Sequence, residues 1–127
     1  MKKNNLFNSF KCAFNGIKTV FFKERNFKIH TLAMILVIIF GFILKLSLFE
    51  WIICLICFAL VMGLEMINTA IEKTVDLAEP NYNETAKLAK DIAAGAVFIV
   101  AIFSAIIGII IFAPKLLTFI SNILNNF

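Results

Sequence analysis

The chain has 127 residues, of which 61% are hydrophobic and 16% are charged. Soluble domains are about half apolar and about a quarter charged, so this composition excludes an ordinary soluble enzyme and indicates a single membrane domain over residues 1–127. The net charge of +4 comes from basic residues beside apolar segments, which favours membrane lipids over nucleic acid as partners.

Residues 6–28 are predicted to form an amphipathic helix on the membrane surface. Apolar side chains recur at steps of three and four from Leu6 to Phe21, and asparagine and lysine residues fill the opposite side. Seven Lys or Arg residues precede the first long apolar segment, so we expect no cleaved signal peptide.

Three segments are long and apolar enough to cross a bilayer, over residues 29–49, 51–76 and 86–113. Pro114 is expected to end the third helix, and residues 114–127 have the spacing of an amphipathic tail along the outer interface. The sequence therefore predicts an all-α integral membrane protein with three transmembrane helices and an N-terminal surface helix.

Most Lys and Arg residues lie on one side of these segments. Seven precede the first segment, and Lys73, Lys87 and Lys90 flank the connection between the second and third, whereas Lys45 and Lys115 lie at the other ends. The positive-inside rule predicts a multi-pass protein with its N-terminus and this second connection in the cytoplasm.

A row of polar side chains on the second membrane helix is the strongest functional signal. Only 14 uncharged residues separate Glu50 from Glu65. As a helix they span about 21 Å, less than the roughly 30 Å apolar core of a bilayer. We therefore expect Glu65 inside the membrane, where a carboxylate costs about 2.5 to 3.5 kcal/mol. The spacing places Asn68, Glu72 and Asp76 on the same helix face as Glu65.

These acidic residues need cations or protons to offset their mutual repulsion. Oxygen ligands without thiolate or imidazole favour Mg²⁺ among the common metals. The row faces Lys90 and Asp91 at the start of the third membrane helix, so the residues predict a metal–phosphate site near the cytoplasmic boundary. The alternative is that acids such as Asp76 form solvated salt bridges with Lys73 and Lys90.

Other candidate sites in the sequence are weaker. By spacing alone, Glu24 is an ordinary interfacial charge, and His30 is a headgroup or packing contact because the chain has no second histidine for a metal site. Cys54 and Cys57 are expected to be free packing thiols. The sequence contains no Walker-type or dinucleotide-binding glycine motif and no protein-kinase signature, which excludes soluble-type kinases and Rossmann enzymes.

Three stretches resemble one known family, the prokaryotic diacylglycerol kinases and undecaprenol kinases. They are ERNFKIH at 24–30, LEMINTAIEKTVDL at 64–77 and AKLAKDIAAGAV at 86–97, and the similarity extends over about residues 9 to 114. The resemblance implies a homotrimer in a bacterial plasma membrane, with active sites between subunits near the cytoplasmic face. It also implies a lipid kinase that uses ATP and Mg²⁺.

The expected lipid substrate follows from the branch of the family that this sequence resembles more. ERNFKIH and NTAIEKTVDL resemble the Gram-positive undecaprenol kinases more than the Gram-negative diacylglycerol kinases. The expected reaction transfers the γ-phosphoryl group of ATP to undecaprenol and gives undecaprenyl phosphate, a carrier of cell-wall precursors. The alternative acceptor is diacylglycerol, which would give phosphatidic acid.

The resemblance also implies roles for individual residues. Glu65 is expected to be the general base, and Glu24 and Glu72 are expected to hold Mg²⁺ on the ATP phosphates as part of the nucleotide site. The other expected catalytic residues are Asn68 and Asp76. The other expected nucleotide-binding residues are Tyr82, Lys90 and Asp91.

Two observations leave alternatives open. Cys12 stands where nucleotide-binding members of the family carry an aromatic residue in the surface helix, so the resemblance does not say how adenine is held. A proton or cation conduit would also place acids along one helix face, but it would not require the pair of Lys90 and Asp91.

Overall fold

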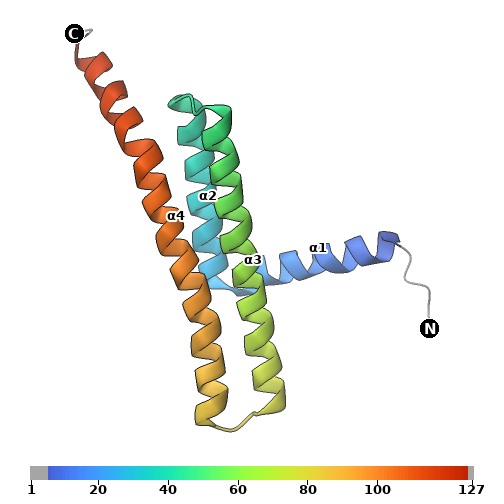
Figure 1. Cartoon of the computed structure of the whole chain (residues 1–127). Coiled ribbons are helices and arrows are strands. Elements are labelled where there is room, and N and C mark those ends of the chain that lie inside the picture. The colour runs from blue at the N-terminus through green and yellow to red at the C-terminus, as the bar shows by residue number, and fades with distance from the viewer. Residues whose placement is uncertain (1–5, 126–127) are drawn as a thin grey trace.

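A computed structural model describes residues 6–125 and contains four helices, α1 (Leu6–Lys23), α2 (Arg25–Ile43), α3 (Leu48–Ala78) and α4 (Glu84–Leu124). In Figure 1, α2, α3 and α4 run alongside one another, and α1 projects sideways from this bundle. By length and composition, α2, α3 and α4 could each cross a membrane. These findings confirm the expected all-helical fold with three candidate membrane-crossing helices.

The chain turns from α1 into the bundle at Glu24. This residue has an extended backbone (φ −97°, ψ 122°) and is the N-cap of α2, whereas the sequence predicted one helix over 6–28. Apolar spacing does not reveal a break of a single residue, so the prediction merged two helices. Buried Val20 and Phe27 lie on either side of the break, and the ring of Phe27 meets that of Phe21 edge to face.

The α2–α3 turn is closed by backbone hydrogen bonds that end α2. The N–H of Leu46 donates to Gly41 O at 3.0 Å, and the N–H of Lys45 donates to Phe42 O at 3.3 Å. This is a Schellman motif, and it places Lys45 in the left-handed region at φ 54°, where glycine is the usual residue. Leu46 is buried directly after the turn, and an apolar contact at this position frequently accompanies the motif.

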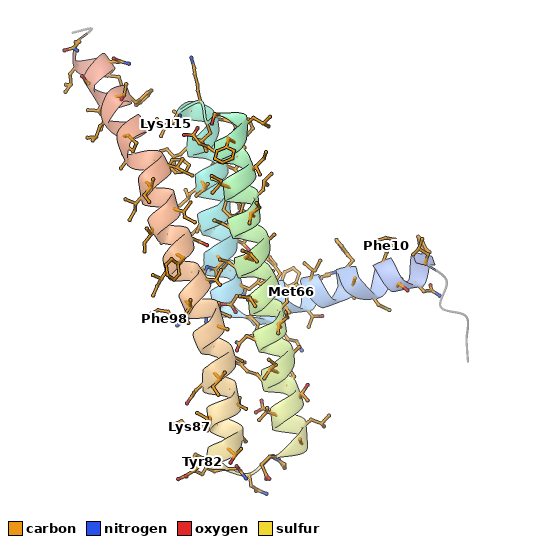
Figure 2. All side chains as sticks on the ribbon, viewed as in Figure 1. Phe10, Met66, Tyr82, Lys87, Phe98 and Lys115 are labelled. Carbon is orange, nitrogen blue, oxygen red and sulfur yellow. The ribbon has the colours of Figure 1, made fainter. Side chains whose placement is uncertain are left out.

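A capping box starts α3, and its glutamate also pairs with a lysine of α4. Glu50 N–H donates to Ser47 Oγ at 3.3 Å, and Ser47 N–H donates to Glu50 Oε2 at 2.6 Å. Lys115 of α4 lies 3.1 Å from the same carboxylate oxygen. This end of the bundle therefore holds α3 and α4 together through a polar cluster, and Figure 2 shows Lys115 far from Tyr82 and Lys87 at the α3–α4 connection.

The buried apolar core lies near the α2–α3 turn. Leu46, Cys54 and Ile111 are buried there, and Trp51 and Phe58 pack against them. Cys54 and Cys57 are free thiols, as the sequence predicted. Most large apolar side chains of the three long helices are exposed, so the bundle requires lipid or further protein around it.

Helix α4 continues through Pro114 to Leu124, so the prediction that Pro114 ends the third helix is wrong. Proline lacks the N–H that would donate to the carbonyl of Ile110, four residues earlier, but membrane helices tolerate this loss. In Figure 1 the predicted tail therefore extends α4 past the α2–α3 turn, although residues 126–127 lie outside the described part.

Helices α3 and α4 are joined by a short loop at the opposite end of the bundle. Helix α3 ends at Ala78, two residues beyond the predicted range of 51–76, and α4 begins at Glu84 instead of residue 86. Asn83 is the N-cap of α4, because its Oδ1 accepts hydrogen bonds from the N–H groups of Thr85 and Ala86. In Figure 1 this hairpin extends past the level of α1.

Candidate active site

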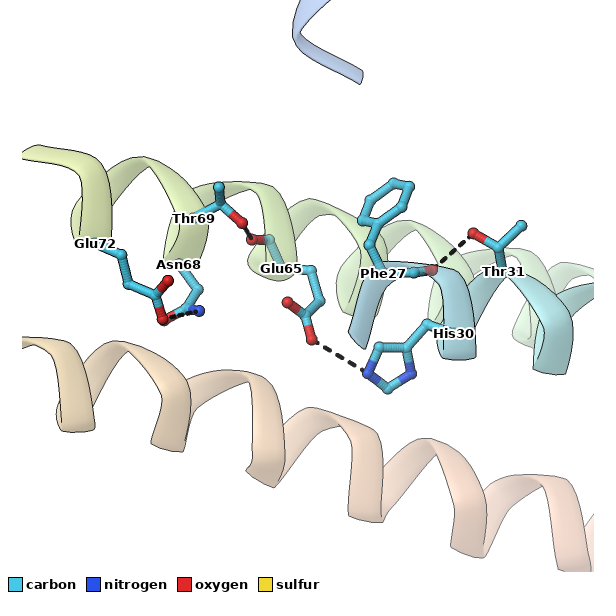
Figure 3. A network of polar contacts seen from close by, with 7 residues as sticks. All are labelled: Phe27, His30, Thr31, Glu65, Asn68, Thr69 and Glu72. Carbon is cyan, nitrogen blue, oxygen red and sulfur yellow. Dashed lines mark hydrogen bonds and ion pairs between the residues drawn. The ribbon is translucent and has the colours of Figure 1, made fainter. Parts of the chain in front are cut away.

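The buried polar side chains of the described chain are Glu65, Asn68 and Thr69, all on α3. The side chain of Glu65 is only 5% exposed. Thr69 Oγ1 donates to the carbonyl of Glu65 at 3.0 Å, so its hydroxyl is satisfied by its own helix. Helical spacing places Glu65 and Asn68 on one face, which turns toward α2 and α4 (Figure 3).

Glu65 contacts His30 of α2. His30 Nε2 lies 3.4 Å from Glu65 Oε1, and the imidazole is 26% exposed (Figure 3). The sequence interpretation of His30 as a headgroup or packing contact missed this partner. Spacing along the chain could not reveal it, because the two residues lie on different helices.

Asn68, one turn after Glu65, bonds the next acid along α3. Its Nδ2 donates to Glu72 Oε1 at 3.1 Å, which fixes the orientation of Glu72 (Figure 3). Asn68 Oδ1 is buried and has no hydrogen-bond partner among the described residues. A buried amide oxygen without a donor costs about 1 to 3 kcal/mol. This oxygen is therefore available to a cation, a water molecule or a substrate hydroxyl.

A second polar group lies farther along α3, close to the loop. Lys90 Nζ lies 2.9 Å from Asp76 Oδ1, with 37% and 56% of the two side chains exposed. Along the helix axis, Asp76 is about 16 Å from Glu65 at 1.5 Å per residue. Tyr82 and Asp91 are both exposed, and neither lines the cavity beside Glu65.

Glu24 and Glu72 are the residues expected to hold Mg²⁺. Both are partly buried and lie close enough to Glu65 for their charges to act on it. Within residues 6–125, no three His, Cys, Asp or Glu side chains converge as a complete metal site. Mg²⁺ commonly binds one or two carboxylates and fills its other positions with waters and phosphates. The oriented Glu72 carboxylate and the free Asn68 oxygen are donors of the kind this ion prefers, so they fit it.

A cavity of about 470 Å³ opens beside Glu65 and Asn68, between α2, α3 and α4. Asn26 and His30 of α2 line it on one side, and Glu65 and Asn68 of α3 on another. On the α4 side the lining includes Gly95, whose missing side chain leaves space. The buried carboxylate therefore faces a space large enough for a substrate hydroxyl and part of a phosphate group.

Comparison with known proteins identifies the family. The family model described as prokaryotic diacylglycerol kinase matches residues 11–112. The undecaprenol kinase of Bacillus subtilis is 47% identical over 113 residues, which cover 89% of this chain and 92% of that protein. The diacylglycerol kinase of Synechocystis is 42% identical over 90% of this chain and 66% of its own length. That of Haemophilus influenzae is 32% identical over 84% of this chain and 87% of its own length. The chain therefore belongs to the prokaryotic diacylglycerol kinase family and is a lipid kinase.

Proposed function

We propose that this enzyme transfers the γ-phosphoryl group of ATP to undecaprenol, with Mg²⁺ bound, and releases undecaprenyl phosphate. One observation carries the proposal: a buried carboxylate, Glu65, lines a polar cavity that adjoins an apolar groove. The 47% identity to an undecaprenol kinase over most of both chains supports this acceptor. The 42% and 32% identities to diacylglycerol kinases support diacylglycerol as the alternative.

The apolar groove suits the hydrocarbon chain of a lipid alcohol. It has a volume of about 690 Å³ and is lined along α2, α3 and α4 from His30 to Leu116, with side chains such as Phe40 and Phe58. His30 and Ala101 line both the groove and the polar cavity, so the two spaces meet beside Glu65. A lipid chain lying in the groove would bring its terminal hydroxyl to that carboxylate.

Phosphoryl transfer requires in-line positioning and neutralisation of charge more than covalent help from the protein. Glu65 would accept the hydroxyl proton as the oxygen attacks the γ-phosphorus, and the bond from that phosphorus to the β–γ bridging oxygen would break and release ADP. Glu24 and Glu72 would hold Mg²⁺, which neutralises phosphate charge when bound. Asn68 would keep Glu72 in place, and Lys90 would balance the negative charge of the nucleotide.

A complete site requires more than one chain in this proposal. The pair of Asp76 and Lys90 lies about 16 Å along α3 from Glu65, so one chain presents two separate polar groups. Exposed apolar side chains cover the three long helices, and further copies would cover part of that surface. We therefore propose a homotrimer with active sites between subunits. The positive-inside rule supports a cytoplasmic location for the N-terminus, the α3–α4 loop and the site.

A substrate panel tests the proposal directly. Purified full-length protein in lipid vesicles would receive labelled ATP and Mg²⁺ with undecaprenol, diacylglycerol or ceramide at equal concentrations. We expect the highest kcat/KM for undecaprenol, and ATP consumption only when a lipid alcohol is present. A clear preference for diacylglycerol would overturn the acceptor assignment. Cation flux through the vesicle membrane without lipid-dependent ATP consumption would support the conduit interpretation instead.

A further inference from the structure

His30 is the nearest basic group to the buried carboxylate. Within residues 6–125, it is the one Lys, Arg or His side chain with a nitrogen within 4.0 Å of Glu65, and it is the only histidine in the sequence. The other charged side chains close enough to act electrostatically on Glu65 are Glu24 and Glu72, and both are acidic. The α4 residues that line the cavity, such as Gly95 and Phe98, are uncharged.

The contact between His30 and Glu65 joins the imidazole to carboxylate oxygen Oε1. His30 Nε2 lies 3.4 Å from Oε1, a separation that is long for a hydrogen bond and that can shorten when substrate binds. A general base works only when its accepting oxygen faces the proton it removes, and a misplacement of about 1 Å can cost about 100-fold in rate. A group that holds Oε1 leaves Oε2 free for the lipid hydroxyl.

We infer that His30 is a positioning residue that orients Glu65 at the junction of the polar cavity and the apolar groove. The imidazole lines both spaces, so it lies beside the path along which a lipid hydroxyl reaches the carboxylate. Donation from Nε2 to Oε1 fixes the plane of the carboxyl group, and Oε2 then accepts the hydroxyl proton. This inference rests on the proposed function, because it assigns Glu65 as the base.

Kinetics of two His30 variants test the role. In His30→Leu, which removes the donor, we expect kcat to fall about 10- to 100-fold while the KM for ATP stays the same. In His30→Gln, whose amide can donate to Glu65, we expect most of kcat to return. Thr31→Val is the matched control on α2, because Thr31 Oγ1 donates only to the backbone carbonyl of Phe27, at 2.8 Å. Its kcat should stay within about twofold of the wild type.

A double variant shows whether His30 acts through Glu65. In a Glu65→Gln background, His30→Leu should lower the residual rate no further, because the group it orients is already lost. An equal loss in both backgrounds, or an unchanged kcat in His30→Leu, would overturn the inference. If His30→Leu does not fold, His30→Asn serves in its place, because its shorter amide does not reach Oε1.

The same experiments separate this inference from the acceptor assignment. Each variant is measured with whichever lipid alcohol the wild type phosphorylates best. A preference for diacylglycerol would remove undecaprenol as the proposed acceptor and leave the His30 measurements interpretable. Failure of Glu65→Gln to lower turnover would remove the base itself, and the role of His30 with it.

Discussion

The ammonium group of Lys90 lies 2.9 Å from Asp76 Oδ1 and connects α4 to α3 near their loop. Both side chains are partly exposed, with 37% and 56% of their surfaces accessible. Exposed ion pairs contribute about 0 to 1 kcal/mol to stability. Stability alone is therefore a weak reason for this pair, which is consistent with the nucleotide-binding role proposed for Lys90.

Replacing Lys90 should impair catalysis much more than folding. In Lys90→Met we expect kcat/KM for ATP to fall about 10- to 100-fold, because a hydrogen bond to a charged group is worth about 1.5 to 3 kcal/mol. The melting temperature in detergent should change little. A charge swap, Lys90→Asp with Asp76→Lys, would recreate the pair without restoring activity. Recovery of activity in the swap would show that the pair is structural.

Removing the charge of Glu65 should abolish catalysis without unfolding the protein. Glu65→Gln keeps the shape of the side chain but cannot accept a proton, and general base catalysis contributes about 10²- to 10⁴-fold. Lipid-dependent release of ADP, measured in vesicles, should fall by at least about 100-fold. Glu79→Gln is the matched control, since Glu79 is the C-cap of α3, beyond the polar row. Turnover that persists in Glu65→Gln would contradict the base assignment.

Replacing Asn68 should weaken the apparent affinity of the enzyme for Mg²⁺. Its Nδ2 orients Glu72, and its buried Oδ1 has no partner among the described residues. Groups that orient metal ligands typically contribute about 10- to 100-fold to affinity. In Asn68→Ala we therefore expect the Mg²⁺ concentration for half-maximal rate to rise by about that factor. Thr69→Val removes a neighbouring hydroxyl that bonds only its own helix, and it should leave the Mg²⁺ dependence unchanged.

Periodicity and bilayer thickness predicted much of this arrangement. The length of the apolar segment predicted that Glu65 lies inside the membrane, and the helical spacing predicted that Asn68, Glu72 and Asp76 share its face. The structure shows Glu65 buried and Asn68 bonded to Glu72. The shared face depends only on the geometry of one helix, which the sequence determines directly, whereas the depth of Glu65 in a membrane stays a prediction.

Contacts between helices could not be predicted in the same way. The approach of His30 to Glu65 depends on how α2 packs against α3, and periodicity carries no information on that packing. The path of α4 through Pro114 was predicted wrongly because a local rule for proline was applied where a membrane helix overrides it. The break at Glu24 was missed because apolar residues continue on both sides of it.

Packing at the α2–α3 turn gives a prediction that concerns stability alone. Gly41 is buried, and a Cβ added there would lie 2.7 Å from Cη2 and 2.8 Å from Cζ2 of Trp51. The indole is rigid and also packs against Phe42, with ring centroids 5.0 Å apart, so it cannot move aside cheaply. Overpacking of this kind costs about 1 to 3 kcal/mol, more than the roughly 0.5 to 1 kcal/mol that alanine gains over glycine in a helix.

Thermal unfolding in one detergent measures the balance between these two effects. Gly41→Ala should lower the melting temperature, whereas Gly16→Ala, whose Cβ would meet nothing within 4 Å, should maintain or raise it. Trp51→Leu should be less stable than the wild type because it leaves a cavity. Adding Gly41→Ala to Trp51→Leu should then cost little, because the clashing ring is gone. Equal destabilisation by Gly41→Ala in both backgrounds would mean that the indole is not what makes glycine necessary at this position.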